Sequence, residues 1–103
     1  MLMNELLTEM QRQQLLAAWE TQNELNPMVY VKIDVPALKR SWYIVACHEN
    51  GAFYGFTDHP WPEFISFSEA DFYAMWERGG MDVLPDHTFQ PCRLQQLRTR
   101  LGR

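Results

Sequence analysis

The chain has 103 residues, 47% of them hydrophobic, which predicts a single globular domain over residues 1–103 and excludes a disordered chain. Its two cysteines are too few for a disulfide framework, and no stretch approaches the ~20 apolar residues that span a bilayer. The first residues also lack the features of a signal peptide. We therefore expect a cytoplasmic protein with reduced thiols and no membrane partner.

The formal charge of −4 is distributed unevenly along the chain. Residues 41–91 carry eight acids and one base, Arg78, for a charge of −7, whereas residues 92–103 carry four arginines and no acid. Neutralising a phosphate backbone requires Lys and Arg, so direct binding of nucleic acid is not expected of the acidic part. Either this part is a solubilising surface, or it meets a basic partner.

Residues 5–22 are predicted to form an amphipathic helix. Thr8 and Gln11 have the spacing of a capping box, and the apolar stripe consists of Leu15, Leu16 and Trp19. Pro27 ends this segment. Residues 28–35 then alternate strictly, with Val29, Val31, Ile33 and Val35 on the side predicted to face the core.

Two further strands are predicted, at residues 41–47 and 52–57, joined by a hairpin turn at residues 48–51. The first is apolar on both faces, as a central strand is, and Asn50-Gly51 readily takes the positive φ angles of a tight turn. Gly55 inside the second indicates a bulge or a close approach to the backbone. A short fourth strand is possible at Phe64-Ile65.

Two helices are predicted after this meander. Ser66 and Glu69 have capping-box spacing, so a helix is expected from Ser66 to the Gly79-Gly80 pair. Residues 81–91 are irregular or contain a short edge strand around Thr88-Phe89, and the last helix spans residues 92–101. This order predicts an α+β fold, with an antiparallel sheet of three to four strands, an N-terminal helix and two C-terminal helices packed on it.

Cys47, His48, His87 and Cys92 are the residue types of a zinc site, but their spacing is poor. Zinc sites favour ligand pairs two to four residues apart, and adjacent residues on a strand point to opposite faces. We predict no metal site and no cofactor.

The turn at residues 57–63 gathers acidic, imidazole and aromatic side chains between two prolines. Asp58, His59 and Glu63 could form an acid/base group, but no activated nucleophile accompanies them. We predict instead that Asp58 braces the turn and that Glu63 reaches the first amides of the following helix. Trp61, between the prolines, is predicted to be exposed as a contact residue.

The sequence resembles a small family of unknown function encoded on plasmids and integrative conjugative elements. The resemblance covers about nine tenths of the chain in short motifs. These motifs are Leu6-Leu7-Thr8, Gln11-Arg12, Leu15-Leu16-Ala17, Pro27, Val29, Val31, Lys32, Trp42, Tyr54-Gly55-Phe56-Thr57-Asp58, Pro62-Glu63, Ser66, Glu69, Leu84-Pro85-Asp86 and Phe89. The chain departs from the family at His59-Pro60-Trp61, where the family is rich in glycine.

The resemblance implies a context and assigns no catalytic residue. Genes of this family travel with antirestriction and other anti-defence genes. The expected function is therefore a non-enzymatic protein-binding module of a mobile genetic element, such as an anti-CRISPR or antirestriction inhibitor, whose acidic surface occupies the basic groove of a nucleic-acid-handling protein. The candidate contact residues are Asp58, His59, Trp61, Glu63, Asp82 and Asp86. The alternatives are a small enzyme or ligand-binding domain centred on the turn, and a nucleic-acid binder that uses the C-terminal arginine helix.

Overall fold

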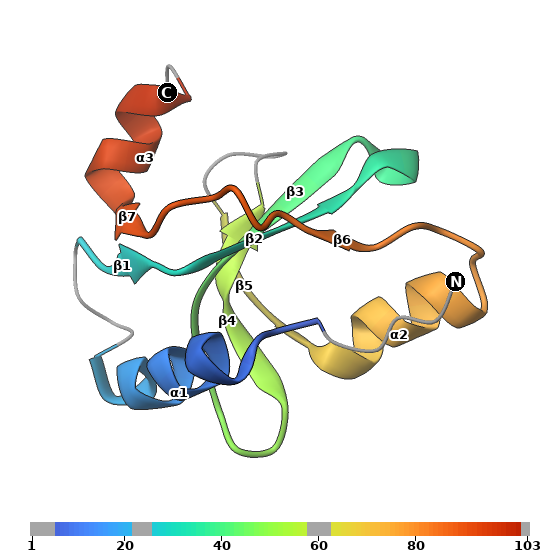
Figure 1. Ribbon diagram of the computed structural model, residues 1–103, viewed down its shortest axis with the longest axis horizontal. Coiled ribbons are helices and arrows are strands. Elements are labelled where there is room, and N and C mark those ends of the chain that lie inside the picture. The colour runs from blue at the N-terminus through green and yellow to red at the C-terminus, as the bar shows by residue number, and fades with distance from the viewer. Residues whose placement is uncertain (1–5, 22–25, 58–62, 102–103) are drawn as a thin grey trace.

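The computed structural model describes residues 6–21, 26–57 and 63–101, and for residues 21 and 63–66 it describes the backbone only (Figure 1). The helices are α1 (Glu9–Ala18), η1 (Trp19–Thr21, a 3-10 turn), η2 (Pro36–Leu38, a 3-10 turn), α2 (Glu69–Glu77) and α3 (Leu94–Arg100). The strands are β1 (Met28–Val29), β2 (Val31–Val35), β3 (Arg40–Cys47), β4 (Ala52–Thr57), β5 (Glu63–Ser68), β6 (Leu84–Pro85) and β7 (Cys92–Arg93).

The described elements form the predicted α+β fold. Five antiparallel strands make a sheet in the order β5-β4-β3-β2-β6, and β1 pairs with β7 in a separate two-stranded sheet. In Figure 1, α1 and α2 lie along one side of the strands, whereas α3 lies beyond β7 near the C-terminus. The sheet contains one strand more than the three to four predicted, because the short β6 pairs along β2.

The N-terminal helix begins where the sequence predicts. The Oγ1 atom of Thr8 accepts a hydrogen bond from the N–H of Gln11 at 3.1 Å, and the Gln11 side chain accepts one from the N–H of Thr8 at 2.9 Å. This reciprocal capping satisfies two of the amides that a helix start leaves free. Leu15 of the predicted stripe is fully buried, whereas Met10 on the same helix is exposed.

The alternating segment at residues 28–35 is divided into β1 and β2. Val29, Val31, Ile33 and Val35 are all buried, which confirms the predicted register. The strand is interrupted at Tyr30, because the residues before it pair with β7 and those after it pair with β3. One continuous sequence pattern therefore serves two sheets.

The central strand β3 contributes to two hydrophobic clusters, one on each face of the sheet, because successive side chains on a strand point in opposite directions. The first cluster contains Leu6, Leu7, Leu15, Val31, Ile33, Val35, Trp42, Ile44, Cys47, Phe53, Phe72 and Val83. The second cluster contains Val29, Tyr43, Val45, Ala46, Phe56, Cys92, Leu94 and Leu97. The helices α1 and α2 thus cover the first face, while α3 covers the second together with Ala18 and Trp19 at the end of α1.

The β3–β4 hairpin turns at residues 48–51, as predicted. Gly51 has a φ of 90°, and the N–H of His48 donates to the Ala52 carbonyl at 2.8 Å. The register between the strands shifts between Ile44 and Ala46, opposite Gly55. A Cβ atom at Gly55 would lie 2.0 Å from the Tyr43 carbonyl oxygen, so this position requires glycine for close approach and confirms the predicted irregularity.

The start of α2 differs from the prediction. The N-cap is Ser68, whose hydroxyl accepts from the N–H of Asp71, and Asp71 accepts in return from the N–H of Ser68. Ser66 lies instead within β5, where its partner across the ladder is Tyr54. The fourth strand is thus longer than the Phe64-Ile65 pair predicted. With Ser66 as the cap, Glu63 would lie three residues before the start of the helix. The observed cap is Ser68, so Glu63 lies five residues before it, at the first position of β5.

In residues 81–101, the edge strand and the start of the last helix also differ from their predicted positions. The edge strand is Leu84–Pro85, while Thr88 and Phe89 lie in a turn in which the N–H of Phe89 donates to the Asp86 carbonyl at 3.2 Å. The last helix begins at Leu94, since Cys92 and Arg93 pair with β1. Within this segment Leu94 and Leu97 are buried, and Leu101 is exposed.

Candidate functional site

The residues of the predicted contact turn are only partly visible. Asp58, His59 and Trp61 lie outside the described residues. Of Glu63 the structure describes the backbone, which pairs with Thr57 at the first position of β5. The candidate acids Asp82 and Asp86 are both described, and their surroundings differ.

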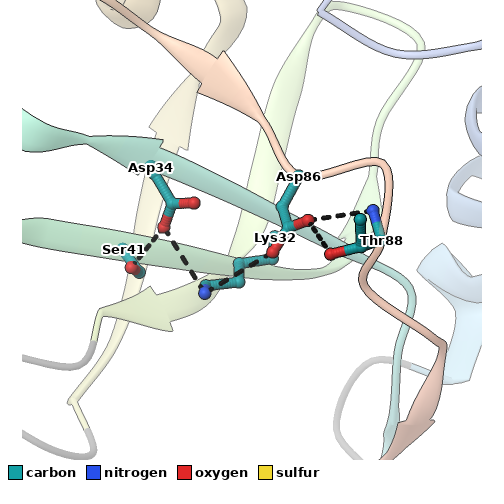
Figure 2. A network of polar contacts seen from close by, with 5 residues as sticks. All are labelled: Lys32, Asp34, Ser41, Asp86 and Thr88. Carbon is teal, nitrogen blue, oxygen red and sulfur yellow. Dashed lines mark hydrogen bonds and ion pairs between the residues drawn. The ribbon is translucent and has the colours of Figure 1, made fainter.

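Asp86 holds a turn together (Figure 2). Its Oδ1 atom accepts hydrogen bonds from the N–H and the hydroxyl of Thr88, at 2.9 and 2.6 Å. Its Oδ2 atom lies 3.6 Å from the Lys32 Nζ atom, which is also 3.6 Å from Oδ1 of Asp34. The hydrogen bonds from Thr88, together with the nearby Lys32, hold the pKa of the Asp86 carboxyl below its usual value. Asp86 is therefore a clamp that fixes residues 84–88 against β2.

Asp82, in contrast, is exposed and makes no ion pair or hydrogen bond to the described residues. Glu49 and Glu77 share this property. Glu69 does not, because its Oε1 atom is buried and lies 2.5 Å from Nη2 of Arg12. This contact raises the pKa of the Arg12 guanidinium and ties α1 to the start of α2. The acidic surface expected of residues 41–91 thus loses Glu69 and Asp86 to internal ion pairs.

The four residues of zinc-ligating type are separated. Cys47 belongs to the first cluster and Cys92 to the second, and both thiols are buried. Burial raises the pKa of the Cys47 thiol, which disfavours the thiolate that binds metal. Within residues 6–21, 26–57 and 63–101, no three His, Cys, Asp or Glu side chains are grouped so as to hold a metal ion.

The arginines of the last segment have two different roles. The Nη1 atom of Arg93 donates to the Asn26 carbonyl at 3.2 Å, and the N–H of Gln95 donates to the Asn26 side chain at 3.0 Å, so this end of α3 is docked on the chain before β1. Arg98 and Arg100 are exposed near the end of the helix. They leave a small basic surface on α3, away from the unpaired acids of residues 77–82.

A groove of about 450 Å³ opens beside the C-terminal half of α2, and the sequence did not indicate it. Trp42 and Phe72 form its floor, with their rings 5.5 Å apart in an edge-on arrangement. The flexible side chains of Met75 and Met81 line it. Its lining residues come from β3, α2 and the segment after α2, so the groove cannot be predicted from any single stretch of the sequence.

A second, smaller pocket of about 230 Å³ lies between the end of α1 and the hairpin. It is lined by Leu16, Trp19, Glu20, His48 and Glu49. The Trp19 and His48 rings meet edge-on, with centroids 5.2 Å apart. The Nδ1 atom of His48 accepts a hydrogen bond from the N–H of Asn50 at 3.3 Å, so this nitrogen is already used within the turn.

Comparison with protein-family models, with curated proteins and with solved structures finds no match to this chain. Among the described residues, no helix is both long and apolar enough to cross a membrane. The site must therefore be interpreted from its own residues.

Proposed function

We propose that this chain is a non-enzymatic protein-binding module of a mobile genetic element and that it inhibits a host defence system of the anti-CRISPR or antirestriction type. The observation that carries the proposal is the unpaired state of Glu49, Glu77 and Asp82 among the described residues. Proteins that bind nucleic acid present Lys and Arg to phosphates, and a surface of unpaired carboxylates competes for the same side chains. The family resemblance on the motifs given above supplies the biological context.

The clamp geometry supports a surface that is fixed before binding. The two ion pairs of Arg12 with Glu69 and of Lys32 with Asp86 join segments far apart in sequence. Their role is internal, so the acids that remain for a partner lie on the hairpin and at the end of α2. Exposed charges of this kind change association rates and salt dependence more than they change packing.

A plasmid-transfer assay tests the proposal. Cells with an active restriction or CRISPR system are transformed with a targeted plasmid, with and without the protein. We expect the protein to raise transformation and the Glu49→Gln, Glu77→Gln, Asp82→Asn triple variant to lose this effect at an unchanged melting temperature. No rise against any system tested contradicts the proposal.

The matched control neutralises exposed side chains of the opposite charge. Arg98→Gln with Arg100→Gln changes two exposed side chains of α3 and should leave the inhibition intact. If this variant loses activity while the acidic variant keeps it, the arginine helix is the working surface. In a gel-shift assay, we expect no appreciable binding of duplex DNA at physiological salt, since few arginines are free for phosphate contacts.

A further inference from the structure

We propose that residues 84–101 form a strap that opens as one unit under native conditions and uncovers the second face of the sheet, while the first face stays folded. The strap consists of β6, the Asp86 turn, β7 and α3 (Figure 1). It contains none of the acids on which the proposed function rests, so it can be tested independently of that function. The starting observation is that the strap supplies buried residues to one hydrophobic cluster only.

Cluster membership separates the strap from the first face. Cys92, Leu94 and Leu97 of the strap are buried in the second cluster, and Phe89 packs against this cluster. The first cluster takes no residue from the range 84–101, all of which the structure describes. Lifting the strap therefore removes apolar contacts from the second face and leaves the packing of the first face unchanged.

Short ladders attach the strap to the strands. β6 pairs with β2 at two positions and β7 pairs with β1 at two, whereas β4 pairs with β5 at six. Two further backbone hydrogen bonds extend the short ladders, from the N–H of Asp86 to the Lys32 carbonyl and from the N–H of Leu94 to the Pro27 carbonyl, both at 2.9 Å. Opening the strap breaks these contacts and leaves the ladders that join β2, β3, β4 and β5 intact.

The side-chain contacts that hold the strap are largely open to solvent. Asp86 accepts two exposed hydrogen bonds from Thr88 and pairs with Lys32. Farther along the strap, the side chain of Asn26 accepts an exposed hydrogen bond from the N–H of Gln95. Water replaces contacts of this kind at little cost, so each contributes little to the closed state. The apolar side chains in the second cluster therefore supply most of the free energy that keeps the strap closed.

The strap is expected to open as a unit because α3 depends on its docking. This helix has seven residues, and isolated helices shorter than about 12–15 residues are marginal in water. Its buried side chains are Leu94 and Leu97, and its N-cap is Arg93 of β7. Once the two leucines leave the second face, the helix loses the packing that stabilises it, and the adjoining ladder loses its support. Cooperative units of local unfolding often coincide with such supersecondary elements.

Opening the strap changes the surroundings of one of the two cysteines. The Tyr43 ring stacks on Phe56 and lies 6.1 Å from the Phe89 ring, centroid to centroid, so an open strap removes one neighbour of this aromatic pair. It also exposes the thiol of Cys92, a residue that is 3% exposed in the closed state. Cys47, in the first cluster, is 1% exposed and stays covered. The two thiols therefore report separately on the strap and on the first face.

Thiol labelling of the folded protein tests the proposal. The protein is incubated with iodoacetamide at concentrations to which the labelling rate is proportional, and mass spectrometry follows each cysteine. Each rate is divided by the rate of the same cysteine in the urea-unfolded chain. We expect the relative rate of Cys92 to exceed that of Cys47 at least about tenfold, with both far below one. Equal relative rates, a higher rate at Cys47, or a Cys92 rate equal to that of the unfolded chain overturns the proposal.

A change within the strap, away from Cys92, tests whether the strap opens as a unit. Leu97→Ala removes a buried anchor of α3 and should accelerate the labelling of Cys92 at least about tenfold. The control Leu101→Ala changes an exposed side chain and should alter this rate less than about twofold. If Leu97→Ala leaves the Cys92 rate unchanged, a local fluctuation exposes the thiol, and the proposal fails.

A change in the first cluster tests whether the two faces open separately. Ile33→Ala destabilises the closed and open states of the strap alike, relative to the unfolded chain. It should therefore accelerate the labelling of Cys47 at least about tenfold and change that of Cys92 less than about twofold. If Ile33→Ala does not fold, Ile33→Val gives the same comparison, with an acceleration of about two- to tenfold at Cys47. Equal acceleration at the two thiols means that the faces unfold together, and it overturns the proposal.

Discussion

The two faces of the five-stranded sheet are covered in different ways. On the first face, α1 and α2 pack over Trp42 and Phe72, and a groove remains open beside α2. On the second face, α3 and the strand before it cover Tyr43 and Phe56, whose rings stack 5.3 Å apart. The same strand, β3, supplies side chains to both faces. The opening thus lies where α2 ends, and the strands between the two faces contribute buried side chains to both clusters.

The largest effect is expected at the strand beneath the first face. Ile33 is fully buried in β2, so Ile33→Ala should lower the free energy of unfolding by about 2–5 kcal/mol through lost burial and a residual cavity. Ile33→Val removes a single methylene and should cost only about 0.5–1.5 kcal/mol. Urea denaturation measures both. If Ile33→Ala loses less free energy of unfolding than Ile33→Val, the packing around Ile33 does not contribute to stability as proposed.

On the second face, the corresponding change is Leu97→Ala in α3. Leu97 is buried, but the helix is short and near the end of the described chain, so the site can relax. We expect a loss of about 2 kcal/mol, at the low end for such truncations. Leu101→Ala, at a side chain that is 37% exposed, is the control and should change stability by less than about 0.5 kcal/mol. Equal losses in the two variants contradict the assignment of α3 to this face.

The ion pair that joins the helices of the first face comes next. Arg12→Met leaves the buried Oε1 atom of Glu69 without its partner, which should cost about 1–3 kcal/mol. Replacing both residues, as Arg12→Met with Glu69→Met, should recover part of this loss, because no buried charge remains. A double variant as unstable as the sum of the single variants refutes this coupling. Thermal unfolding of the four proteins gives the interaction free energy.

A smaller effect is expected where the chain crosses from one face to the other. Val83 belongs to the first cluster and Phe89 packs against the second, with the Asp86 clamp between them. At neutral pH, Asp86→Asn should lower stability by about 0.5–1 kcal/mol through loss of a partly buried ion pair and weakened hydrogen bonds.

The pH dependence of the stability difference between Asp86→Asn and the unaltered protein tests whether the Asp86 carboxylate is the stabilising group. The folded chain lowers the pKa of Asp86 from the ordinary value of 3.8, so the carboxylate stabilises the fold above that pH. Its contribution is lost as the pH falls through the lowered folded value. The difference between the two proteins should therefore shrink in acid. The control Asp82→Asn, at an unpaired position, should show no such dependence.

The smallest change touches neither face. Lys39, in the turn between β2 and β3, has a φ of 51°, a left-handed conformation that costs a side chain roughly 1–2 kcal/mol. Lys39→Gly removes this strain but adds a chain-entropy cost of roughly 0.5–1 kcal/mol, so stability should rise by at most about 1.5 kcal/mol. Lys39→Ala keeps the Cβ atom and should show no gain. A melting temperature that falls in the glycine variant contradicts the argument.

Local chemistry predicted part of this fold, and tertiary pairing decided the rest. The Thr8–Gln11 cap and the burial of Val31 and Ile33 follow from neighbours in sequence, and both are confirmed. Ser66 and Ser68 both stand three residues before an acid, and only the pairing of β5 with β4 selects Ser68 as the cap. That choice depends on residues more than ten positions away.

The candidate site was less predictable for the same reason. The count of acids was visible, but the ion pairing of Glu69 with Arg12 depends on the packing of two helices. The groove joins Trp42 to Met81, which are brought together by the reversal at Gly80. Only the Gly79-Gly80 pair marks this place in the sequence, and by itself this pair predicts no more than a helix end.

The pairing of β1 with β7 has a consequence for the order of folding during synthesis. Val29 is matched with Cys92, so its cover arrives only after most of the chain has left the ribosome. Until then, the aromatic side chains of the second face lack the cover that α3 provides. Contacts between residues this far apart slow folding and leave apolar surface exposed to other chains. We expect nascent chains stalled before residue 92 to engage chaperones, and chains extended past residue 101 to be released from them.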